Sequence, residues 1–113
     1  MHRGEVWLIN LDPTVGAEIR KTRPAVIVND DAVGLLPLKV IVPVTEWKDR
    51  YSIAPWMVRI EANSENGLDK VSAADAFQVR SLAQERFVRK LGKLSDSVMT
   101  SIGRALAVVL SID

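Results

Sequence analysis

Short apolar runs separated by turn-forming residues make up most of this chain of 113 residues. Such runs are typical of β-strands, because the apolar residues of a helix would recur with a period of 3.6. The pattern predicts strands at residues 4–11, 25–28, 40–44, 56–61 and 87–91. It also predicts extended structure at residues 71–82, with a break near Asp75. Pro43 indicates an edge strand or a bulge, because proline cannot donate a ladder hydrogen bond.

The end of the chain shows a different pattern, typical of an amphipathic helix. Its apolar residues recur at helical spacing: Val98, Ile102, Leu106, Val109 and Leu110. Either Ser95 or Asp96 can cap this helix at its N-terminus. Ser81 and Gln84, three residues apart, resemble a capping box for one more short helix. We therefore expect a single, mostly β domain over residues 1–113, a small curved sheet or open barrel with the helix packed against it.

Cysteine is absent and the only histidine is His2. Disulfides, thiol catalysis and cysteine metal sites are thereby excluded, and the usual zinc ligands and neutral-pH general base are missing. We therefore expect no metal and no other cofactor. The first residues lack the basic stretch and apolar segment of a signal peptide, and no apolar run approaches the roughly 18 residues of a membrane span. On this basis we expect a protein of the cytoplasm, without a membrane partner.

Charge alone does not point to nucleic acid, because 15 basic and 14 acidic residues leave a net charge of only +1. A nucleic-acid interaction would have to depend on local clusters of cations. One cluster comprises Arg20, Lys21 and Arg23. A second comprises four cations interrupted by apolar residues, which favours a solvated face over a phosphate-binding track: Arg86, Arg89, Lys90 and Lys93.

A long polar loop precedes the second predicted strand, and long loops in small domains are often functional. It contains Glu18, Arg20 and Lys21 and ends at Arg23, beside Pro24. Arg23 would stand at the mouth of a buried strand, where a rigid scaffold can position a catalytic cation. The alternative is an ordinary arginine at a strand end, in solvent.

Thr45 has a similar position after the third strand, at the start of a second long loop. If the two strands are neighbours, Arg23 and Thr45 would emerge close together at the rim of the sheet. Threonine is also common in strands, so Thr45 alone indicates little.

The second loop, residues 45–55, alternates aromatic and cationic residues: Trp47, Lys48, Arg50 and Tyr51. Exposed rings beside cations are typical of sites for single-stranded nucleic acid, because bases stack on the rings while cations follow the phosphates. The alternative places Trp47 in the core. The pair Asp30–Asp31 could ligate magnesium, although a turn between strands explains it better.

Several segments, in order along the whole chain, resemble the MazF/PemK/Kid family of toxins. The most specific are Arg3-Gly4-Glu5-Val6-Trp7-Leu8, residues 11–18 and residues 22–28. Residues 42–45 resemble the next family motif, and residues 67–68, 78–80 and 90–94 resemble later landmarks.

The resemblance implies an SH3-like barrel of antiparallel strands with a C-terminal helix, usually a homodimer. It implies the toxin of a type II toxin–antitoxin system, inhibited by a cognate antitoxin. Its activity would be metal-independent cleavage of single-stranded RNA at short preferred sequences, giving a cyclic phosphate and a 5′-hydroxyl. The family's catalytic arginine and Ser/Thr fall on Arg23 and Thr45, and its first-loop glutamate falls on Glu18. We assign RNA binding to seven residues: Arg20, Lys21, Trp47, Lys48, Arg50, Tyr51 and Arg80.

The chain departs from the family at three positions. Val71 stands where many relatives have an acidic residue, Ala17 where some have histidine, and Phe77 near the position of an aspartate. These departures concern proton transfer and leave Arg23 and Thr45 unchanged. Two alternatives require no catalytic pair: a non-enzymatic poison of DNA gyrase, as in the CcdB toxins whose fold is similar, and a barrel that serves as an adaptor.

Overall fold

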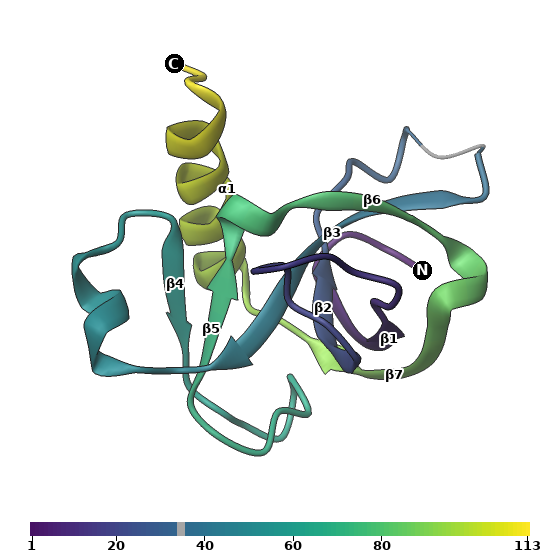
Figure 1. The fold of residues 1–113 in the computed structure, drawn as a ribbon, viewed down its shortest axis with the longest axis horizontal. Helices are drawn as coiled ribbons and strands as arrows, with labels where there is room; N and C mark the ends of the chain where they lie inside the picture. The colour runs from purple at the N-terminus through teal and green to yellow at the C-terminus, as the bar shows by residue number, and fades with distance from the viewer. Residues whose placement is uncertain (34–35) are drawn as a thin grey trace.

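A computed structural model, which describes residues 1–33 and 36–113, shows a strongly curved antiparallel sheet with one helix packed against it (Figure 1). Its first four strands are β1 (Glu5–Asn10), β2 (Thr22–Ile27), β3 (Leu38–Glu46) and β4 (Met57–Ile60). The others are β5 (Ser72–Asp75), β6 (Arg80–Ala83) and β7 (Phe87–Lys93), followed by α1 (Asp96–Leu110). The order is β4-β5-β3-β2-β1-β7, with β6 also paired to β3. The predicted fold class, small curved antiparallel strands followed by a C-terminal helix, is confirmed.

Strand β3 lies inside the sheet rather than at its edge. One side pairs with β2, from Ala25–Pro43 to Ile27–Ile41. The other side pairs first with β6, up to Ile41–Arg80, and then with β5, from Val44–Ala74 onward. Of the two alternatives for Pro43, an edge strand or a bulge, the edge strand is therefore wrong.

Proline is tolerated inside β3 because of the direction in which its nitrogen points. The Val28 amide donates to the Val40 carbonyl at 2.9 Å, so Val40 presents its backbone groups to β2. Alternate residues of a strand point to opposite neighbours, so the backbone nitrogen of Pro43 points to the β5 and β6 side. There the short 3-10 helix η2 (Ala76–Gln78) separates the two ladders, and no ladder hydrogen bond is lost.

The two faces of the sheet bury different clusters of apolar residues. Val26, Val42 and Val44 belong to the first cluster, which α1 covers with Met99 and Ile102. Ala25, Ile27 and Ile41 belong to the second, which includes Ile9, Leu11 and Leu82. Because side chains alternate along a strand, this division assigns every position of β2 and β3 to a face.

The C-terminal helix begins as predicted, with Ser95 as N-cap accepting a hydrogen bond from the Val98 amide at 3.3 Å. The capping box at Ser81 is wrong: Ser81 pairs with Val40 in the sheet. The 3-10 turn η3 (Gln84–Arg86) that follows begins without a side-chain cap. In the part of the chain that the structure describes, no helix is long and apolar enough to cross a membrane.

Candidate active site

The first loop, residues 11–21, is closed at its base by hydrogen bonds between its own ends. The Leu11 amide donates to the Lys21 carbonyl at 2.9 Å, and the Lys21 amide donates to Asp12 Oδ1 at 3.0 Å. Lys21 adopts a left-handed φ of 71°, which reverses the chain so that it enters β2. Within the loop, Glu18 Oε1 accepts a hydrogen bond from the Val15 amide at 2.6 Å. Arg20 and Lys21 are exposed on this loop.

Arg23 and Thr45 lie on the same face of two neighbouring strands. Arg23 is the second residue of β2 and pairs with Ile9, whereas Thr45 is inside β3 and pairs with Ala73. The β2–β3 pairing ends at Ala25–Pro43, and Arg23 and Thr45 are each two residues beyond that pair on their own strands. Alternation puts both side chains on the face of the second apolar cluster. Both residues are half-buried, and Arg23 Nε donates to the Arg20 carbonyl at 3.2 Å.

The prediction that Thr45 opens the second loop is wrong by two residues, because β3 extends to Glu46. Pairing with β5 holds Thr45 and Glu46 in the sheet. This pairing joins residues far apart in sequence, so the local polar composition around Thr45 did not indicate it.

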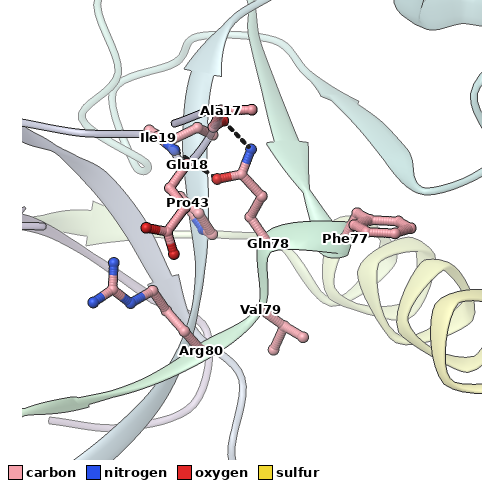
Figure 2. Close-up of a pocket in the computed structure, with 8 residues that line it drawn as sticks. All are labelled: Ala17, Glu18, Ile19, Pro43, Phe77, Gln78, Val79 and Arg80. Carbon is pink, nitrogen blue, oxygen red and sulfur yellow. Dashed lines mark hydrogen bonds between the residues drawn. The ribbon is translucent and has the colours of Figure 1, made fainter. Parts of the chain in front are cut away.

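A pocket of about 450 Å³ opens on this face, between the first loop, β3 and the segment that joins β5 to β6 (Figure 2). Its lining is part polar and part apolar: Ala17, Glu18, Ile19, Pro43, Phe77, Gln78, Val79 and Arg80. The structure therefore brings the predicted residues Glu18 and Arg80 together. In Figure 2 their charged groups extend to one side of the pocket and Phe77 to the other. Phe77 is 65% exposed, and its ring packs edge-on against that of Trp56, with 5.8 Å between centroids.

Two polar residues at the pocket, Asp75 and Gln78, were not identified as site residues from the sequence. Asp75 is 5% exposed and accepts hydrogen bonds from the Phe77 amide at 3.1 Å and from Gln78 Nε2 at 3.2 Å. Burial raises the pKa of its carboxyl above the ordinary 3.8, and these hydrogen bonds only partly offset the effect. An aspartate between Ala74 and Ala76, in an otherwise apolar stretch, was the available signal.

The second loop forms a separate group on the 3-10 helix η1 (Asp49–Ile53) and its flanks. The rings of Trp47 and Tyr51 pack edge-on with 5.8 Å between centroids. The guanidinium carbon of Arg50 lies 5.4 Å from the Tyr51 ring, and that of Arg59 lies 5.5 Å from the Trp47 ring. Trp47 is half-buried and belongs to neither core cluster, and Lys48 is exposed.

Of the other candidate clusters, the acidic pair Asp30–Asp31 belongs to a turn and the second cation cluster is largely exposed. Asp30 Oδ1 accepts from the Ala32 amide at 2.8 Å, and Asp31 Oδ1 accepts from the Arg3 amide at 2.7 Å, as expected for a turn. In the second cation cluster, Arg89, Lys90 and Lys93 are exposed along β7. Among residues 1–33 and 36–113, no three acidic or histidine side chains gather in a way that could hold a metal ion.

Known proteins resemble this chain over its whole length. The sequence model of the PemK-like, MazF-like toxins of type II toxin–antitoxin systems matches residues 2–110. Endoribonuclease MazF9 of Mycobacterium tuberculosis is 33% identical, with 99% of this chain and 98% of the relative covered. Endoribonuclease MazF of Staphylococcus saprophyticus is 34% identical, with 99% of this chain and 92% of the relative covered.

A solved structure of a mycobacterial endoribonuclease in complex with its cognate antitoxin has the same fold. It superposes with a TM-score of 0.80 at 22% identity and covers 100% of this chain and 97% of its own. Together with the fold, these matches establish that the chain belongs to the PemK-like, MazF-like family of type II toxins.

Proposed function

We propose that this protein is the toxin of a toxin–antitoxin pair and cleaves single-stranded RNA, in practice mRNA, without a metal. One observation carries the proposal: Arg23 and Thr45 occupy matching positions on neighbouring strands, on the face that also carries the pocket with Glu18 and Arg80. The names of the relatives, which are endoribonucleases, support this activity over poisoning of gyrase.

The pair suits a reaction in which the RNA supplies its own nucleophile. The 2′-hydroxyl attacks the adjacent phosphorus, the bond to the 5′-oxygen breaks, and the products are a cyclic phosphate and a 5′-hydroxyl. Negative charge develops on the phosphorane oxygens between these two events. The planar guanidinium of Arg23 can bind two of these oxygens at once, and the Thr45 hydroxyl can donate to a nonbridging oxygen.

Glu18 supplies the only carboxylate among the residues that line the pocket. Its Oε1 accepts from the Val15 amide, which orients the carboxylate so that Oε2 is available to accept the 2′-hydroxyl proton. Arg80, whose Nη1 donates to the Leu11 carbonyl at 3.4 Å, adds positive charge to the same pocket. The leaving 5′-oxygen takes its proton from water, because arginine does not release protons near neutral pH.

Binding of the RNA is divided between the two loops. Arg20 and Lys21 are exposed beside Arg23, where they can pair with phosphates. Trp47 and Tyr51 offer rings for base stacking, and Lys48 and Arg50 offer cations beside them. This arrangement favours a single strand, because the bases of a duplex cannot reach the rings.

The partners follow from the same comparison. We infer that the protein acts in the cytoplasm and is inhibited by a cognate antitoxin, as the mycobacterial relative is found in complex with its own.

We also infer a homodimer, since β4 and β7 end the strand order and Val88 of β7 is 57% exposed. Sedimentation at micromolar concentration should then give twice the 12.5 kDa of one chain, and a 12.5 kDa species alone would exclude the dimer.

The proposed activity is tested by incubating the purified protein with a long unstructured RNA and mapping the new ends. Discrete cuts that leave a cyclic phosphate and a 5′-hydroxyl are expected. A parallel assay of DNA gyrase supercoiling tests the alternative of a gyrase poison, and we expect the gyrase to stay active. Intact RNA together with inhibited gyrase would overturn the proposal.

A further inference from the structure

The side chain of Gln78 connects the β5–β6 segment to the first loop with both ends of its amide. Its Oε1 accepts from the Ile19 amide at 2.6 Å, and its Nε2 donates to the Ala17 carbonyl at 3.4 Å (Figure 2). These two loop residues flank Glu18 on either side. A single side chain therefore binds the backbone immediately before and immediately after the glutamate.

The rest of the loop has few other attachments. Within the described part of the chain, residues 13–20 hydrogen-bond to one residue outside the loop and its flanks, and that residue is Gln78. The remaining hydrogen bonds join the loop to itself or to Arg23. Ile19 also packs, half-buried, against the second apolar cluster. Arg80 and Arg86 bond to the carbonyls of Leu11 and Asp12 at the start of the loop, so Gln78 is the hydrogen-bonded attachment of the outer part, residues 13–20.

Asp75 determines which way the Gln78 amide points. Its Oδ1 accepts from the Phe77 amide and its Oδ2 accepts from Gln78 Nε2. A carboxylate only accepts, so the Gln78 nitrogen must face Asp75 and the oxygen must face the Ile19 amide. If the amide were reversed, two donors would meet at Ile19 and two acceptors would meet at Asp75.

We propose that Asp75 and Gln78 form a latch that holds the first loop, with Glu18, at the pocket in the conformation that RNA cleavage requires. The proposal rests on the function inferred above for that pocket. Both are positioning residues: Asp75 is buried, and the amide of Gln78, which lines the pocket, is hydrogen-bonded to the loop backbone and to Asp75. The latch consists of hydrogen bonds, so the positions of its donors and acceptors matter as well as the shapes of the two side chains.

Two substitutions of nearly unchanged shape test that polarity. Asp75→Asn must keep its oxygen toward the Phe77 amide, so its new amide group faces Gln78 Nε2 and two donors meet. Adding Gln78→Glu restores an acceptor toward both this new amide group and the Ile19 amide, but it gives up the 3.4 Å hydrogen bond that Gln78 donates to the Ala17 carbonyl. The single substitution should therefore release the loop, and the double substitution should hold it again in part.

Trypsin reports the state of the loop without any RNA. Arg20 and Lys21 are exposed cleavage sites inside it, whereas the bond after Arg23 precedes Pro24 and resists cleavage. We expect Gln78→Ala and Asp75→Asn to increase early cleavage after residues 20 and 21 about tenfold, as for the loss of one or two hydrogen bonds. The matched control is Gln84→Ala, because the Gln84 side chain makes no hydrogen bond to the described residues.

The same variants are then compared in RNA cleavage. Gln78→Ala and Asp75→Asn should lower the single-turnover rate at saturating RNA about tenfold or more, with little change in RNA affinity. The double variant should recover part of that rate and be faster than Asp75→Asn alone, whereas a merely structural role would make two substitutions worse than one. Circular dichroism confirms that each variant is folded.

The outcomes separate the latch from the proposed function. Tryptic cleavage of Gln78→Ala equal to that of the parent and of Gln84→Ala would overturn the latch. A released loop with an unchanged cleavage rate would overturn its role in catalysis. If the parent cleaved no RNA, the proposed function would be wrong, and the tryptic comparison would still decide whether Asp75 and Gln78 hold the loop.

Discussion

Arg23 and Thr45 occupy matching positions on β2 and β3, each two residues past the Ala25–Pro43 pair. At this point β3 exchanges one partner for another, because its opposite side pairs with β5 from Val44 onward. Both side chains are half-buried and belong to neither apolar cluster. Substitution at either position therefore removes a functional group without opening a cavity in the core.

The second loop leads to a prediction about binding. Trp47→Ala should raise the KM for RNA about five- to one-hundredfold, as for the loss of one stacked base, and should leave the rate at saturating RNA nearly unchanged. The measurement is cleavage of a short fluorescent RNA over a range of concentrations. Val108→Ala, at an exposed residue of α1, is the control. An unchanged KM for Trp47→Ala would remove the loop from the RNA site.

Metal removal leads to a second prediction. Cleavage should continue at the parent rate in excess EDTA, because the proposed reaction uses only Arg23, Thr45 and a proton acceptor. Activity that stops on chelation and returns with magnesium would show that the proposed mechanism is wrong.

The pKa of Asp75 leads to a prediction about pH. Because burial raises this pKa above 3.8, the folded protein binds the proton at a higher pH than the unfolded chain does. The contribution of this group to stability is therefore fully present below pH 3.8 and is lost as the pH rises through the folded pKa. An asparagine side chain does not titrate, so the stability of Asp75→Asn relative to the parent should increase between pH 3 and pH 7.

The same group can be observed directly by NMR. The side-chain amide resonances of Gln78 should titrate with a midpoint above 3.8, because Nε2 donates to Asp75, and the titration should vanish in Asp75→Asn. Glu18→Gln is the control for the other acid at this pocket. A midpoint below 3.8 would contradict the raised pKa.

Glu5 leads to a prediction that stability depends on pH in the opposite direction from that for Asp75. Burial alone would raise its pKa, but hydrogen bonds from Trp7 and the His2 backbone, with the positive N-terminus and Lys90, lower it. Its contribution is present above the ordinary 4.5 and is lost as the pH falls through the folded pKa. Glu5→Gln should cost about 1–3 kcal/mol at pH 7 and less in acid, measured by urea unfolding. The exposed Glu85→Gln is the control, and equal losses would contradict this role.

Much of the fold was predictable because local sequence patterns determine where its strands and its helix begin and end. The apolar runs located β1, β2 and β3, the break at Asp75 coincided with the end of β5, and Ser95 marked the start of α1. Cross-strand relationships were not predictable in this way. Pro43 is tolerated inside the sheet only because η2 interrupts the neighbouring ladders.

The site shows the same division. Arg23, Thr45 and Glu18 could be proposed from their places beside long loops and from the family resemblance. Gln78 could not be connected to Glu18, because the hydrogen bond to Ile19 joins residues 59 positions apart. Such a contact depends on how the β5–β6 segment folds back onto the first loop. No local pattern in the sequence predicts this long-range packing.

Catalysis of RNA cleavage by Arg23 and Thr45 is tested most directly by the single-turnover cleavage rate of Arg23→Ala. The rate should fall at least about 100- to 1000-fold, as for the loss of a donor to a developing charge, while circular dichroism and antitoxin binding stay as in the parent. Arg23→Lys should recover little, because an ammonium cannot replace the planar fork. Thr45→Ala should fall by a smaller factor, and Thr45→Ser should keep much of the activity. A folded Arg23→Ala protein that cleaves RNA at the parent rate would contradict the account.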